Sequence, residues 1–158
     1  MHIPWSDMAE NCGKVLAAFA LSLPLGWERQ RDERSVGLRT FPLVAVASCG
    51  YVLLAGKAFP GNAAEHSRVL QGLITGIGFV GGGAILKTGS TVRGTATAAS
   101  IWNTGAVGAA VALGIYEIAI ILSLINLVTL QVFTRLEQKM FAGPDVAPGP
   151  PSKPDGPA

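Results

Sequence analysis

The stretch VLQGLITGIGFVGGGAIL, residues 69–86, runs for eighteen residues without a charged side chain. A helix needs about twenty mostly apolar residues to cross the roughly 30 Å hydrocarbon core of a bilayer. The six glycines of this stretch weaken a helix, because glycine costs about 1 kcal/mol relative to alanine. In lipid, however, small residues let a neighbouring helix come close. The stretch therefore predicts a membrane-spanning helix with close helix contacts.

The composition of the whole chain also favours a lipid environment. Of its 158 residues, 49% are hydrophobic and 14% are charged, whereas soluble domains carry about 25% charged residues. The mean hydropathy is +0.43. Further apolar runs fall at 9–27, 41–59, 95–114 and 115–133. We therefore predict an all-α, polytopic transmembrane helical bundle of about five spans, forming one domain over residues 1–141.

Two boundaries of this bundle depend on local signals. The last two apolar runs are almost continuous, and Gly114 marks the expected break between them. The alternative is one very long helix. After Phe141 the sequence is rich in proline and glycine, which predicts a disordered cytoplasmic tail over residues 142–158.

Lysine and arginine fall unevenly on the two sides of such a bundle, with nine on one side and three on the other. Positively charged flanks are retained in the cytoplasm. The richer side is therefore predicted to be cytoplasmic, with the N-terminus outside and the C-terminus inside. The richer side holds Arg29, Arg31, Arg34, Arg39, Lys87, Arg93, Arg135, Lys139 and Lys153, and the poorer side holds Lys14, Lys57 and Arg68.

Several function classes are disfavoured by what the sequence lacks. The net charge is only +2 and the basic residues are scattered, so we expect no nucleic-acid partner. Cys12 and Cys49 stand in apolar runs, and no metal-ligand cluster or Ser-His-acid arrangement can be assembled. We therefore predict no catalysis, no metal and no cofactor. No Asp or Glu falls near the middle of a span, where cation carriers usually need one.

The glycines of residues 69–86 also match a nucleotide-binding pattern. Gly76, Gly78 and Gly81 fit G-x-G-x-x-G letter for letter. That fingerprint needs a preceding strand and an acidic residue about 20 positions later. The chain has no acidic residue between Glu65 and Glu117. We therefore reject the nucleotide interpretation.

The favoured interpretation of these glycines is close helix packing. Gly72 and Gly76, and again Gly78 and Gly82, have the small-xxx-small spacing of helix contacts in membranes. Gly81 and Gly83 would widen the same groove. The run at 95–114 carries a second small-residue surface, and a short loop at 87–93 joins the two as a predicted antiparallel pair. The alternative is a broken helix that lines an ion path.

Polar residues inside the spans and at their ends have expected structural roles. Asn103 and Asn126 should form hydrogen bonds between helices. Thr40 precedes Phe41 and Pro42, and we expect its side chain to cap the helix that starts there.

The charged segment 26–40 brings Glu28, Arg29 and Arg39 to the predicted cytoplasmic face, where Arg93 joins them. Juxtamembrane arginines commonly anchor helix ends to lipid headgroups. The alternative is a polar site in which the arginines bind an anion, a lipid phosphate or the carboxylate of a partner.

Three ordered blocks carry a family resemblance. They are Gly26-Trp-Glu-Arg with Gly37-Leu-Arg-Thr40, then Arg68 with the glycine run from Gly76 to Gly83, then Val92-Arg-Gly94 with Thr97 and Trp102. Together they resemble the MgtC/SapB family of bacterial inner-membrane proteins over about residues 16–136. The resemblance implies a five-span, N-out domain linked to magnesium homeostasis, acid tolerance or virulence-related survival inside host cells. It also implies binding to other membrane proteins, including the membrane sector of the ATP synthase.

The residues that match the family pattern are the candidate functional residues. They are Glu28, Arg29, Gly37, Arg39, Arg68, Gly76, Gly78, Gly81, Gly83, Arg93, Gly94, Thr97 and Trp102. The chain departs from the family at Phe41, where many relatives have histidine. The best-studied members also add a folded cytoplasmic domain where this sequence has its proline-rich tail, so functions that need that domain do not carry over.

Three functional hypotheses follow from the sequence. The first is a non-enzymatic regulator whose small-residue helix faces dock onto another membrane protein, or onto a second copy as a homo-oligomer. The second is a transporter of magnesium, protons or a small solute, with its path along the glycine-rich helix. The third is a site for anionic membrane lipid built by the cytoplasmic arginines.

Overall fold

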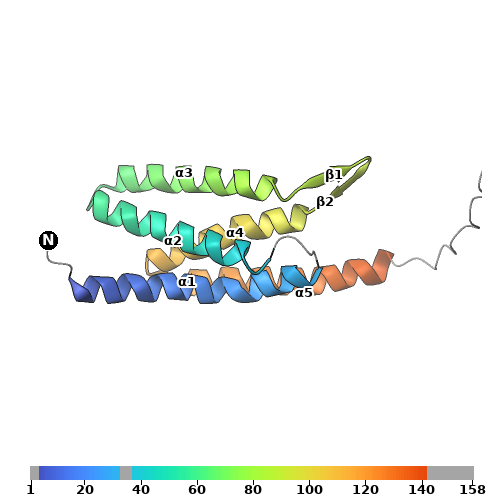
Figure 1. Ribbon diagram of the computed structural model, residues 1–158, viewed down its shortest axis with the longest axis horizontal. Coiled ribbons are helices and arrows are strands. Elements are labelled where there is room, and N and C mark those ends of the chain that lie inside the picture. The colour runs from blue at the N-terminus through green and yellow to red at the C-terminus, as the bar shows by residue number, and fades with distance from the viewer. Residues whose placement is uncertain (1–3, 33–36, 142–158) are drawn as a thin grey trace, which may run out of the picture.

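The computed structural model describes residues 4–32 and 37–141, and this part of the chain folds into five α-helices and one short β-hairpin (Figure 1). The predicted helical class is confirmed. The predicted tail at 142–158 lies outside the described residues, as do Arg34 and Lys153 of the charge count. The helices are α1 (Trp5–Asp32), α2 (Thr40–Ala58), α3 (Ala63–Gly82), α4 (Thr95–Ala112) and α5 (Tyr116–Phe141), and the strands are β1 (Leu86–Thr88) and β2 (Thr91–Arg93).

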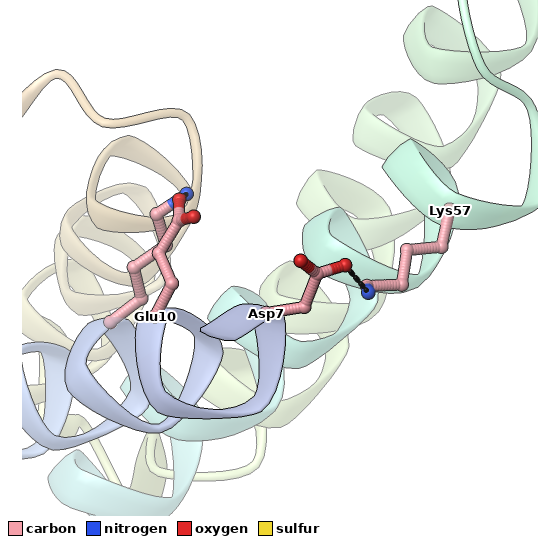
Figure 2. Close-up of polar contacts among 4 residues, drawn as sticks. Asp7, Glu10 and Lys57 are labelled. Carbon is pink, nitrogen blue, oxygen red and sulfur yellow. Dashed lines mark hydrogen bonds and ion pairs between the residues drawn. The ribbon is translucent and has the colours of Figure 1, made fainter. Parts of the chain in front are cut away.

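Successive helices run in alternate directions, which separates the connections into two ends (Figure 1). At one end lie the C-terminus of α1, the N-terminus of α2, the β-hairpin and the N-terminus of α4, and we call it the hairpin end. At the other end, the turn end, α1 begins and α2 connects to α3. Figure 2 shows Asp7 of α1 directed at Lys57 of α2, and this ion pair of 3.2 Å ties the two helices together at the turn end.

Helix α4 lies at the centre of the bundle and contacts each of the other four helices. Glycines make this position available to it. A Cβ atom on Gly108 would overlap the carbonyl oxygen of Ala45 in α2, and one on Gly105 would overlap the side chain of Ile77 in α3. The absence of these side chains therefore lets α2 and α3 pack directly against α4.

Hydrogen bonds made by polar side chains join α4 and α5 inside the bundle. The Ser100 hydroxyl donates to Oδ1 of Asn126 over 2.9 Å, and Nδ2 of Asn103 donates to the Leu122 carbonyl over 3.1 Å. Ser100 and Asn126 are both buried. The expectation that the two asparagines bond across helices is confirmed.

Pro24 lies inside α1 and removes one backbone donor from the hydrogen-bond ladder of this helix. Hydroxyl groups surround this turn of the helix. Ser22 donates to the Phe19 carbonyl over 2.8 Å, and Ser123 of α5 donates to the Leu21 carbonyl over 2.7 Å. Such bonds from serine to backbone accompany proline in buried helices, and the second one also connects α1 to α5.

The helix boundaries confirm one sequence expectation and correct two others. Gly114 has φ +76° and ends α4, so the alternative of one long helix over 95–133 is wrong. The span predicted over residues 69–86 is too long at its C-terminus, because α3 ends at Gly82. The backbone N–H groups of Gly83, Ala84 and Ile85 bond to carbonyls of its last turn. The segment 87–93, expected as a simple loop, belongs to the β-hairpin.

The outer surface of the bundle is strongly apolar. On α5 alone the exposed large side chains include Ile118, Ile121, Leu124, Ile125 and Val128. By length and composition, two of the described helices could cross a membrane, namely α2 and the part of α5 at Tyr116–Phe133. Helix α4 contributes less to this surface, because the other four helices surround it and many of its residues are buried.

Substitution of Gly108 tests the contact between α2 and α4. We expect Gly108→Ala to lower the free energy of unfolding by about 1–3 kcal/mol, because the added methyl group meets the Ala45 backbone. Gly56→Ala is the matched control, since Gly56 in α2 has open space around it and alanine is the better helix former. Thermal unfolding in detergent measures both, and equal melting temperatures for the two variants would contradict this account of the packing.

Candidate functional site

The hairpin end gathers most of the residues that match the family pattern, as the element positions in Figure 1 show. Arg68 lies instead near the turn end, Gly76 and Gly78 lie within α3, and Trp102 lies in α4, where it is exposed. The residues at the hairpin end are Glu28, Arg29, Gly37, Arg39, Gly81, Gly83, Arg93, Gly94 and Thr97.

Gly37 forms the contact between the end of α1 and the start of α2. A Cβ atom on Gly37 would lie 2.8 Å from the carbonyl oxygen of Gly26 and from the backbone nitrogen of Gln30. The Gly37 carbonyl accepts hydrogen bonds from the backbone N–H groups of Thr40 and Phe41, at 3.0 and 3.2 Å. A backbone carbonyl therefore accepts the first N–H groups of α2. The expectation that the Thr40 side chain caps this helix is wrong.

The charged residues of this end differ in their burial. Arg29 is only 5% exposed and takes part in an interaction within the chain, whereas Arg39 and Arg93 are exposed. Glu28 is half-buried and accepts a hydrogen bond of 3.3 Å from Nε2 of Gln131 in α5. Arg29 and Glu28 are thus part of the packed structure, while Arg39 and Arg93 are accessible to a ligand.

Gly94 joins the hairpin to α4 with a backbone conformation that favours glycine. Its φ is +84°, and a Cβ atom there would overlap the carbonyl oxygen of Ala84. Its own carbonyl accepts the backbone N–H of Ala98 at 2.9 Å. A side chain at Gly94 would be strained in both respects, so this family position has a structural explanation.

Gly81 and Thr97 lie where α3 and α4 meet. A Cβ atom on Gly81 would come within 3.0 Å of the Ala98 carbonyl oxygen, so the two backbones are nearly in contact. Thr97 is buried, and Gly83 caps the C-terminus of α3. These three residues hold the end of α3 against the beginning of α4.

Gly76 and Gly78 are not in close contact with another helix of the described bundle. A Cβ atom on either glycine would meet no neighbour within 4 Å, and the same holds for Gly72 and Gly82. Gly72 and Gly76 line an apolar groove of about 410 Å³ between α2 and α3, with Tyr51 on its α2 side. Within the described residues, no helix packs against either small-residue pair predicted from spacing, Gly72 with Gly76 or Gly78 with Gly82.

Arg68 has a local partner in α3. Its Nη1 lies 2.6 Å from Oε1 of Glu65, one helical turn earlier. The backbone N–H of Glu65 bonds to Oδ1 of Asn62, which caps the helix. Arg68 therefore belongs to the start of α3 and is not near Arg39 or Arg93, which lie at the hairpin end.

Two further features of the site were missed in the sequence. Gln131 is the partner of Glu28, and no local signal marks it. The β-hairpin did have a signal, because Gly89 and Ser90 separate two short alternating segments, which is typical of a two-residue hairpin turn. Within the described residues, no group of three His, Cys, Asp or Glu side chains could hold a metal ion. The exposed charged side chains of this end include the cations of Arg39, Lys87 and Arg93.

Comparison with known proteins agrees with the resemblance. The MgtC family model matches residues 15–139. Protein SrpB of Synechococcus elongatus is 33% identical over 150 residues, covering 87% of this chain and 82% of SrpB. YhiD of Escherichia coli K12 is 34% identical over 133 residues, covering 80% of this chain and 61% of YhiD. Protein MgtC of Brucella abortus is 40% identical over 108 residues, covering 66% of this chain and 43% of that protein.

No solved structure matches the chain. The chain spans most of SrpB but less than two thirds of YhiD and of the Brucella MgtC protein. The family match covers most of the sequence and includes every candidate residue named above, from Glu28 to Trp102. The chain is a member of the MgtC family.

Proposed function

We propose that the bundle crosses the bacterial inner membrane five times, with its N-terminus outside and the hairpin end toward the cytoplasm. The observation that carries this proposal is the distribution of side chains between the interior and the surface. Most buried positions hold small or hydroxyl-bearing residues, with Leu25, Phe41 and Ile101 as large exceptions, while many large aliphatic and aromatic residues cover the outside. This distribution suits lipid as the surrounding solvent, because lipid-facing surfaces favour large apolar groups and helix contacts favour small ones.

The individual residues support this interpretation. Ser22, Ser48, Ser100, Thr104 and Ser123 are buried, and each has a hydrogen-bond partner. Groups of this kind can satisfy one another inside a helical bundle without water. The two ends carry the charged residues, which fits contact with the two aqueous faces and the uneven charge count.

The function supported best is that of a non-enzymatic regulator that docks onto a transmembrane helix of another membrane protein through the outer face of α3. This face combines open glycines with exposed apolar side chains. Phe79 is 86% exposed and Ile74 is 51% exposed. Gly76 on one flank of this face and Gly78 on the other leave room for a close approach. The groove beside Gly76 adds a concave surface.

The family connects the protein with magnesium homeostasis, since the name of YhiD describes a candidate magnesium transporter. That name also supports a second candidate function, the transport of magnesium or another small ion. In this function the open glycines of α3 would line a path that a second helix completes.

Cysteine labelling tests the membrane topology. With Cys12 and Cys49 replaced, we expect Ser67→Cys at the turn end to react with an impermeant maleimide in intact spheroplasts. We expect Ser90→Cys in the hairpin to react only after permeabilisation. Both positions are exposed, so reactivity reports their side of the membrane. Equal labelling of the two in intact cells would contradict the proposed orientation.

Photo-crosslinking tests the docking face. A benzophenone amino acid at Phe79 should give an adduct with another membrane protein in vivo, while one at Leu124 of α5 should not. Gly76→Leu together with Gly78→Leu should abolish the Phe79 adduct, because the leucines fill the space that a partner helix needs. Neither glycine contacts the bundle, so the variant should still fold and insert.

Gly56→Leu is the matched control for this variant, since Gly56 is also exposed and open but lies on α2. It should leave the Phe79 adduct unchanged. An adduct of twice the mass of the chain would identify a second copy as the partner. An adduct that persists in the Gly76 and Gly78 variant would count against docking through this face.

Flux measurements separate regulation from transport. Under the regulator proposal, purified protein in liposomes should not change the entry of magnesium or protons under imposed gradients, as followed with trapped fluorescent indicators. Protein-dependent flux that is lost in the Gly76 and Gly78 variant would favour the transporter instead.

A further inference from the structure

Packing within the described structure gives the two strands of the β-hairpin little stabilisation, because their side chains are exposed. Strands β1 and β2 pair antiparallel, with Leu86 opposite Arg93, Lys87 opposite Val92 and Thr88 opposite Thr91. Every residue of the two strands is exposed, and Leu86 and Val92 keep 65% and 52% of their surface accessible. Two-stranded hairpins alone in water are marginally stable at best.

The hairpin is nevertheless held in a fixed position relative to α3 and α4. At its base, the backbone N–H of Ala84 bonds to the Gly81 carbonyl over 2.9 Å, and the N–H of Ile85 bonds to the Gly82 carbonyl over 3.1 Å. Gly94 closes the other strand against Ala84. At the tip, Gly89 has φ +62° at the first position of the two-residue turn, as in a type II′ hairpin. The exposed side chains are thus presented from a well-defined scaffold, which projects from the hairpin end (Figure 1).

The register gives each face of the hairpin the same chemistry. Residues directly opposite each other in an antiparallel pair lie on the same face. One face therefore joins Leu86 to Arg93, and the other joins Val92 to Lys87. The chain has no acidic residue between Glu65 and Glu117. Each face thus offers one aliphatic group beside one cation, and no carboxylate from the hairpin or its flanks neutralises them.

We propose that the hairpin lies in the headgroup layer of the cytoplasmic leaflet and binds anionic phospholipid. Lys87 and Arg93 contact the lipid phosphates, and Leu86 and Val92 lie among the upper parts of the acyl chains. Basic residues near a negatively charged leaflet are attracted to it, and arginine and lysine bind phosphate oxygens through charge-assisted hydrogen bonds. The proposal rests on the bilayer placement given under Proposed function.

Charge complementarity favours lipid over a protein strand as the occupant. A partner strand added to an open edge would be held by backbone hydrogen bonds and would use pockets for alternate side chains. The hairpin instead has a cation on both faces and an aliphatic group beside each one. This pattern matches a layer in which phosphate and hydrocarbon lie close together on every side.

Tryptophan fluorescence in nanodiscs tests the proposal. In a background with Trp5, Trp27 and Trp102 changed to phenylalanine, Val92→Trp reports on the hairpin and Ile125→Trp reports on the middle of α5. Quenching is measured with brominated phosphatidylglycerol and, separately, with brominated phosphatidylcholine. The ratio of the two gives the preference for anionic lipid next to each reporter.

We expect both reporters to be quenched, with a preference for phosphatidylglycerol only at Val92→Trp. Lys87→Gln and Arg93→Gln should each lower this preference about fivefold, the change in affinity that corresponds to one basic residue near an anionic surface. Lys57→Gln is the matched control, because Lys57 lies at the turn end, and it should have no effect.

Two results would overturn the inference, and they differ from failure of the bilayer placement. If Ile125→Trp is quenched and Val92→Trp is not, the hairpin lies outside the bilayer or is covered by protein. If Val92→Trp is quenched equally by both lipids, its binding has no anionic preference. If neither reporter is quenched, the membrane placement itself is wrong.

Discussion

The packing of α4 against its neighbours is the constraint on which the bundle depends. Helix α4 contacts all four other helices. It comes close to α3 and α2 because Gly105 and Gly108, which face Ile77 and Ala45, carry no side chain. The missing side chains bring backbones together at these two contacts, where close packing contributes the contact energy. Many large apolar residues therefore lie on the outside, which makes the surface strongly apolar.

The sequence predicted the helical class, the break at Gly114 and the bonding roles of the two asparagines. These features depend on local signals, namely apolar run length, a glycine at a helix end and polar residues within apolar runs. Gly89 and Ser90 also mark the hairpin locally. The seven residues 87–93 were nevertheless predicted as a loop, because they connect two predicted membrane-spanning helices. The exposed Arg93 and the buried Arg29 could not be told apart, because burial depends on neighbours that are distant in sequence.

The glycine run of α3 shows how spacing alone can mislead. A helix turns about 100° per residue, so nine residues rotate a position by about half a turn. Gly81 therefore faces α4, while Gly72 and Gly76 face the groove beside α2. Spacing identified both sets of small residues but grouped them into one surface. Only the position of α4 in the bundle decides which glycines are used within the chain and which stay open.

The central helix is also the fourth to leave the ribosome. Until α4 is synthesised, α1, α2 and α3 lack a helix that each of them contacts in the folded bundle, and the Ala45 carbonyl and the Ile77 side chain lack their neighbours in α4. During synthesis, the surfaces of the first three helices that later contact α4 are therefore uncovered. A nascent chain stalled before Thr95 would leave the α4-facing surfaces of these three helices uncovered, and the arrival of α4 would cover them.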